Sequence, residues 1–93
     1  MNYQFMKLND GTNIAYSDIK KQNGKEIMYV QAERWNDAHD KFDHLEFVLP
    51  DCTITDGNGF SKEEKEYLVQ RVKKFEHLLF DWAREDGEEA KRR

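Results

Sequence analysis

The feature that most constrains the fold is a run of apolar residues at helical spacing in the last third of the chain. Its members, at steps of four, three, four and three residues, are Leu68, Val72, Phe75, Leu79 and Trp82. Such steps place side chains on one face of an α-helix. Ser61 and Glu64 precede the run with the spacing of a capping box, which marks a helix start. The pattern predicts one amphipathic helix over about residues 62–85, with Gly87 as its stop.

Alternating apolar and polar residues predict β-strands in the preceding part of the chain. The predicted strands are 3–8, 12–19, 26–35 and 43–49, with a short fifth at 52–55. Asp10-Gly11 and Asn23-Gly24 mark tight turns because such turns need positive φ angles. The segments 36–43 and 56–59 are polar and are expected to be loops or turns.

Strands first and a helix last favour an α+β fold. We expect a four- to five-stranded, mostly antiparallel sheet with one long C-terminal helix packed on one face. Residues 1–86 form a single domain, and residues 87–93 form a polar tail. In strand 43–49 the residues expected to face the core are Leu45, Phe47 and Leu49. In strand 3–8, Tyr3 and Phe5 are expected on one face.

Strand 26–35 has apolar residues on both faces near its start. Met28 and Val30 lie on one face, whereas Ile27 and Tyr29 lie on the other. One helix covers one face of a sheet, so we expect part of the second face to be buried by a second copy of the chain.

The helix length predicts an interaction surface. A helix over residues 62–85 would be roughly 36 Å long, whereas strands of this size span about 17–27 Å. Part of the helix should therefore overhang the sheet and expose apolar groups, which usually marks a partner site. The residues assigned to this interaction surface are Tyr67, Val69, Leu78, Phe80 and Trp82.

Composition excludes several classes of protein. Lys and Arg number 15 against 19 Asp and Glu, for a net charge of -4, and this balance disfavours nucleic-acid binding. The chain has no apolar run long enough to cross a membrane and no signal-peptide pattern at its start. Its single cysteine, Cys52, fits a reducing compartment and predicts a cytoplasmic location.

No arrangement of residues predicts catalysis or a cofactor. His39 and His44, with aspartates nearby, are weak candidates for a divalent metal, but their spacing matches no ligand pattern, so no metal is expected. Cys52 has Asp51 and Asp56 as neighbours and no local positive charge, which predicts a structural thiol. We therefore expect a protein that is not an enzyme.

A pattern in the C-terminal half resembles a family. It consists of Leu49-Pro50, then Gly59-Phe60-Ser61, Glu63-Glu64, the apolar helix and Ala83-Arg84-Glu85. This pattern resembles small bacterial proteins built on a domain of unknown function, over roughly the last half of the chain. The resemblance implies a bacterial cytoplasmic setting and brings no catalytic or binding residues with it.

Three functions follow as hypotheses. The first is a non-enzymatic interaction or regulatory module, acting as a homodimer or with another protein partner. The second is an acidic inhibitor that mimics nucleic acid and blocks a basic protein, because residues 36–56 hold six acids and one base. The third is a small metal-binding protein using His39 and His44. The acids of the second hypothesis are Asp37, Asp40, Asp43, Glu46, Asp51 and Asp56.

Overall fold

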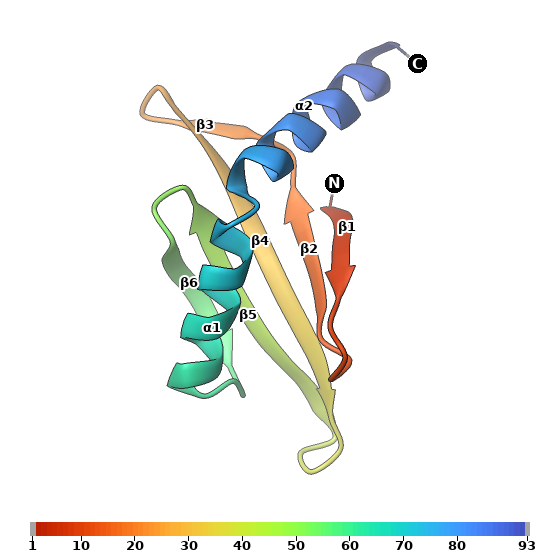
Figure 1. Ribbon diagram of the computed structural model, residues 1–93, viewed down its shortest axis with the longest axis vertical. Helices are drawn as coiled ribbons and strands as arrows, with labels where there is room; N and C mark the ends of the chain where they lie inside the picture. The colour runs from red at the N-terminus through yellow and green to blue at the C-terminus, as the bar shows by residue number, and fades with distance from the viewer. Residues whose placement is uncertain (1, 93) are drawn as a thin grey trace.

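A computed structural model describes residues 2–92 of the chain, with side chains as far as Glu85. It confirms an α+β fold with an antiparallel sheet (Figure 1). In this range the elements are β1 (Asn2–Lys7), β2 (Asn13–Ser17), β3 (Lys20–Gln22), β4 (Lys25–Asn36), β5 (Lys41–Leu49), β6 (Thr53–Asn58), α1 (Lys62–Lys73) and α2 (Glu76–Arg92). The sheet order is β1-β2-β4-β5-β6, and β3 pairs with the start of β4.

The centre of the sheet is the long hairpin of β4 and β5. Alternation along β5 turns Leu45, Phe47 and Leu49 toward the helices, as predicted, and all three are fully buried. On β4 the same face carries Met28 and Val30, which are also fully buried. These residues form the core together with the buried side chains of both helices.

Two strands occupy segments that were expected to be turns. β3 and the start of β4 flank Asn23-Gly24, whose φ angles of 54° and 77° make the predicted tight turn. The predicted strand over 52–55 is confirmed as the first half of β6, but β6 continues to Asn58, so the prediction of a turn over 56–59 is wrong for residues 56–58. Every residue of β6 is exposed. Hydrophobic patterning therefore carried no signal for the continuation, which pairing to β5 defines.

The edge strand β1 contains an irregularity that alternation does not predict. Its register with β2 shifts between Gln4 and Met6, which leaves Phe5 at a β-bulge. Tyr3 lies opposite Tyr16, with ring centroids 5.4 Å apart. Tyr3 and Phe5 both pack against the core, so the prediction that they share a face is confirmed. After the bulge Met6 lies opposite the buried Ile14 and also packs against the core, although alternation predicted the other face for it.

The C-terminal third forms two helices, so the prediction of one long helix is wrong. The capping box at its start is confirmed: the Ser61 hydroxyl accepts from the Glu64 backbone N–H, and the Glu64 carboxylate accepts from the Ser61 backbone N–H. The chain breaks at Lys74 and Phe75 and then resumes as α2. The backbone of α2 continues to Arg92, so Gly87 does not end it.

No helix-breaking residue marks the break, because residues 73–76 contain no Gly or Pro. α1 packs against β5, whereas α2 contacts β1 through Trp82 and β4 through Arg84. The two helices therefore lie over different strands, and each buries its own pair of residues: Leu68 and Val72 on α1, Leu79 and Ala83 on α2.

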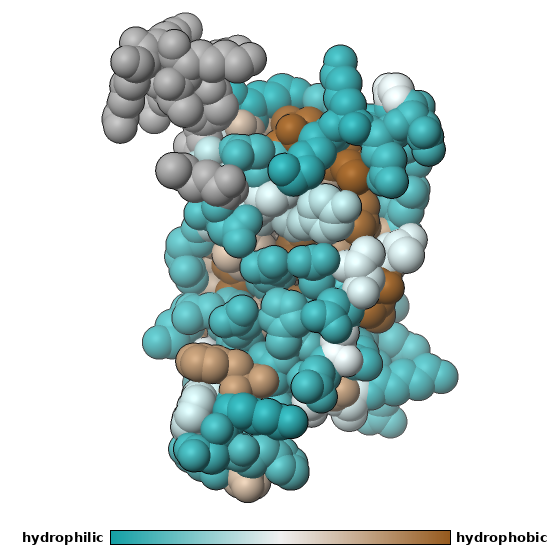
Figure 2. All heavy atoms as spheres, turned by 180° about the vertical axis from the view of Figure 1, so that it is seen from behind, coloured by the Kyte–Doolittle hydropathy of each residue, from teal (hydrophilic) through white to brown (hydrophobic). Residues whose placement is uncertain are grey.

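The sheet face that points away from the helices is mainly hydrophilic (Figure 2). Side chains from four strands form a hydrogen-bonded row across it. Asn2 donates to Gln31 at 3.2 Å, Gln31 donates to Glu46 at 2.9 Å, and Thr55 donates to Glu46 at 2.8 Å. Ala15 of the intervening strand is small enough to let Asn2 reach Gln31. This polar row gives no support to the expectation that a second copy buries the face.

We predict that Gly59 tolerates no side chain. Its φ is 96°, and a Cβ would collide with the Asp43 carboxylate, which Arg34 and Asn36 hold in place. Gly59→Ala should lower the free energy of unfolding by about 3 kcal/mol or more. The matched control is Gly24→Ala, with a φ of 77° but open space around it, which should cost about 1–2 kcal/mol. Urea unfolding measures both, and equal losses would contradict the collision.

Candidate functional site

The structure divides the predicted interaction surface into two groups. Tyr67, Leu78 and Trp82 are 57%, 40% and 37% exposed. Val69 and Phe80 are half-buried and pack against the core. The first group is therefore available to a partner, whereas the second stabilises the fold.

Phe75 joins the exposed group, although its place in the apolar stripe predicted burial. It stands at the helix break and is 38% exposed. Its ring packs edge-on against Phe5 of β1, with centroids 5.6 Å apart, and Trp82 packs against the same Phe5 at 6.1 Å. Leu78 lies one turn from both on α2. We call Phe5, Phe75, Leu78 and Trp82 the α2–β1 strip.

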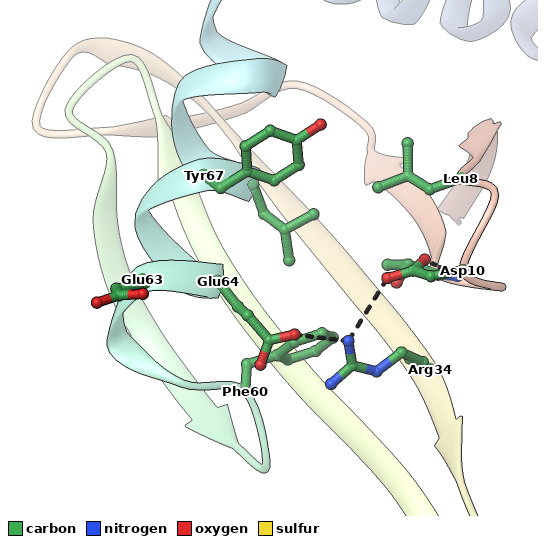
Figure 3. A pocket seen from close by; sticks show the side chains of 9 residues that line it. Leu8, Asp10, Arg34, Phe60, Glu63, Glu64 and Tyr67 are labelled. Carbon is green, nitrogen blue, oxygen red and sulfur yellow. Dashed lines mark hydrogen bonds and ion pairs between the residues drawn. The ribbon is translucent and has the colours of Figure 1, made fainter.

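Two adjoining hollows lie between α1 and the β1–β2 turn. One has a volume of about 220 Å³ and the other about 570 Å³, and they share Leu8, Asp10 and Tyr67. Figure 3 shows the smaller hollow, with Tyr67 on the α1 side and Leu8 and Asp10 on the turn side. Arg34 of β4 lies at one end of it.

Arg34 joins four elements through its guanidinium group. It donates two hydrogen bonds to Asp43, at 3.2 Å from Nε and 2.9 Å from Nη2. Its Nη1 lies 2.6 Å from Glu64 of α1 and 3.5 Å from Asp10 of the β1–β2 turn. The guanidinium also lies over the Phe60 ring, 4.6 Å from its centroid. A buried charge needs such pairing, and Asp43 is 0% exposed.

These contacts fix the charge state of the cluster. The hydrogen bonds from Arg34 lower the pKa of the Asp43 carboxyl, Asn36 adds to the effect, and burial opposes it. Arg34 likewise lowers the pKa of Glu64, with help from the Ser61 backbone N–H. In return, Glu64 and then Asp43 raise the pKa of Arg34. The groups are charged and paired at neutral pH, so the cluster joins elements of the fold and does not present a reactive group.

Sequence reasoning missed this cluster. The available signal is the place of Arg34, which alternation puts on the same face of its strand as Met28, Val30 and Ala32. A charge on an apolar face requires a buried partner. The identity of that partner depends on the register of β4 and β5, which sets Arg34 opposite Asp43.

The candidate metal residues do not come together. His39 lies in the β4–β5 turn, whereas His44 lies on β5 between Glu33 and Asp56, at 3.4 Å from Nδ1 and 3.6 Å from Nε2. The two carboxylates flank opposite nitrogens of the ring, so one ion cannot reach all three groups. Within residues 2–85 no cluster of three or more His, Cys, Asp or Glu side chains is arranged to hold a metal.

Cys52 lies in the turn between β5 and β6 with a φ of 62°, and it is half-buried against the core. Its Sγ lies 3.7 Å from the Pro50 carbonyl oxygen. These contacts belong to the turn.

The acidic segment does not present one continuous surface. Asp43 is buried with Arg34, Asp51 forms an ion pair with Lys25 at 2.8 Å, and Glu46 belongs to the polar row. The two acids of the β4–β5 turn, Asp37 and Asp40, remain exposed. The segment therefore differs from a row of phosphates in both spacing and exposure.

Comparison with protein-family models, with curated proteins and with solved structures found no match. Among the described residues, no helix combines the length and the apolar character that crossing a membrane requires. The site must therefore be interpreted from its own geometry.

We predict that removing Arg34 destabilises the protein at neutral pH and much less in acid. Arg34→Gln leaves Asp43 buried without a counterion, which should cost about 3–5 kcal/mol at pH 7. The folded-state pKa of Asp43 lies below its ordinary value of 3.8, so the stabilisation is present above that value and is lost as pH falls through the folded-state pKa.

The free energies of unfolding of Arg34→Gln and the unsubstituted protein should therefore converge below about pH 4. Urea unfolding between pH 7 and pH 3 measures the difference. The control is Arg84→Gln, whose contacts with Glu26 and Asp81 are exposed and should change stability little at any pH. A difference for Arg34→Gln that stays constant with pH would contradict the assignment.

Proposed function

We propose that the chain is a non-enzymatic protein-interaction module that forms a homodimer through the α2–β1 strip. The observation that carries the proposal is the contiguity of partly exposed apolar side chains on that strip. Soluble proteins usually leave such area uncovered only where a partner binds. Large aromatic residues such as Trp82 also tend to dominate the energy of protein interfaces.

This proposal rests on side-chain exposure in the structure, whereas the prediction from the sequence rested on helix length. The sequence argument used the length of a single straight helix, and the break at Lys74 and Phe75 removes that argument. Direct exposure of Phe75, Leu78 and Trp82 supports the proposal instead. The break itself contributes to the strip, since it places Phe75 beside Phe5.

A second copy fits the strip in hydrophobicity. A two-fold axis at Leu78, with the two α2 helices antiparallel, sets Leu78 against its own copy and the Phe75 end of one strip against the Trp82 end of the other. One apolar strip can therefore cover another.

The remaining hypotheses have less support. Half of the acids in residues 37–56 are held in ion pairs or in the polar row, which argues against the nucleic-acid mimic. The separation of His39 from His44 argues against a metal-binding role. We propose that the module acts in the cytoplasm, in accessory or regulatory work, which fits a single cysteine and a net negative charge.

We predict that size-exclusion chromatography with light scattering at micromolar concentration gives twice the chain mass of 11.2 kDa. Leu78→Lys should shift the protein to the monomer mass, because two like charges would then face each other across the axis.

The matched control is Ile54→Lys, at a residue of similar exposure (44%) on β6. It should remain a dimer. A monomer at every concentration of the unsubstituted protein would reject the proposal, and equal dissociation of both variants would reject the strip as the interface.

A further inference from the structure

The turn between β4 and β5 carries an exposed aromatic pair. Trp35 and Phe42 lie opposite each other on the two strands, 48% and 56% exposed, with ring centroids 5.1 Å apart and planes inclined by 76°. They lie on the sheet face opposite the helices, because their neighbours Arg34 and Asp43 point to the helix side. Figure 1 shows that this hairpin extends beyond the other strands.

Negative charge surrounds the pair. Asp37 accepts a hydrogen bond from Trp35 Nε1 at 2.7 Å, which fixes a carboxylate beside the indole ring. Asp40 is exposed in the same turn, and Glu33 lies on the same strand and face as Trp35. The turn region also holds His39 and Lys41, and Glu33 lies 3.4 Å from His44 Nδ1. We call the pair and these three acids the hairpin tip, and its net charge is negative.

The rest of the protein shows what an aromatic ring with adjacent carboxylates binds. Arg34 lies over Phe60 and pairs with Asp43 and Glu64. Likewise, Arg84 lies over the Phe80 ring and pairs with Glu26 and Asp81. In both cases the cation is a guanidinium group, which is planar, stacks on rings and pairs with carboxylates.

The hairpin tip has the ring and the carboxylates of these clusters without the cation. Among residues 2–85, the guanidinium groups found over rings are those of Arg34 and Arg84, and neither lies over Trp35 or Phe42. Charge complementarity therefore identifies the occupant as a positively charged group from outside the chain.

We propose that the hairpin tip binds arginine side chains of a basic segment on a partner protein. The guanidinium stacks on the exposed Trp35–Phe42 pair, and Asp37 or Asp40 pairs with its N–H groups. The site lies far along the sheet from the α2–β1 strip, and the inference stands whether or not the chain dimerises. A homodimer would carry two such tips and would bind a partner with two basic segments more tightly than one with a single segment.

The test uses the full chain labelled with ¹⁵N and titrated with a tetra-arginine peptide. The two tryptophan indole N–H signals serve as internal reporters. We expect the Trp35 indole and the backbone amides of the tip to shift saturably, while the Trp82 indole stays in place. A tetra-citrulline peptide, equal in shape but uncharged, should cause no shift.

Variants separate a defined site from general attraction to an acidic protein. Phe42→Ala should weaken binding by roughly fivefold. Trp35→Ala should weaken it by a similar factor, and because this variant lacks the Trp35 indole, its binding is measured from the backbone amides of the tip. Tyr67→Ala, at an equally exposed aromatic residue on α1, should bind as the unsubstituted protein does. An unchanged thermal unfolding midpoint for Phe42→Ala confirms that its fold is intact. If Phe42→Ala does not fold, Phe42→Ser replaces it as the test variant.

Three results would overturn the proposal. One is the absence of any shift at the tip up to millimolar peptide. Another is a shift spread over all acidic residues and unaffected by Phe42→Ala, which would indicate nonspecific charge attraction. The third is equal binding of the citrulline peptide. Because Leu78→Lys leaves the tip intact, repeating the titration with that variant shows whether failure concerns the tip or the dimer.

Discussion

The ion pair between Arg34 and Asp43 holds the architecture together. The two residues lie opposite each other on β4 and β5, so the pair fixes the register of the central hairpin. Through Glu64 it also fixes the start of α1, because one carboxylate oxygen of Glu64 accepts from Arg34 and the other from the Ser61 backbone N–H. The conformation at Gly59 follows from the same pair, since the chain must pass Asp43 without a side chain before the helix begins.

The sequence predicted those parts of the fold that follow from local patterns. Alternation located the buried face of β5, the Asn23-Gly24 dipeptide located a turn, and the capping box located the start of α1. It located only the first half of β6, as a short strand over 52–55, and missed the continuation to Asn58, because the residues of that strand are all exposed and its length is set by pairing with β5. Pairing between distant segments leaves no local trace in hydrophobicity.

The helix break and the Arg34 cluster were missed for a related reason. The apolar steps through residues 68–82 remain helical across Lys74 and Phe75, so the sequence contains no sign of a break there. The break belongs to the assembled fold, in which α1 packs against β5 and α2 contacts β1. Likewise, the sequence shows Arg34 on an apolar face but not which acid lies opposite. Of the candidate interaction residues, exposure separates Leu78 and Trp82 from Phe80, and this depends on how α2 lies on the sheet.

The β-bulge at Phe5 determines how this protein can associate with other chains. An uninterrupted edge strand is a template on which further strands add without limit, which leads to fibres. In β1 the shift at Phe5 interrupts the regular order of free backbone groups, so an incoming strand would lose its hydrogen bonds partway along the edge. Beside this shift the Phe5 ring packs against Phe75 and Trp82. Growth by strand addition is thereby discouraged at an edge where apolar side chains favour contact, and assembly there is biased toward closed complexes of defined size.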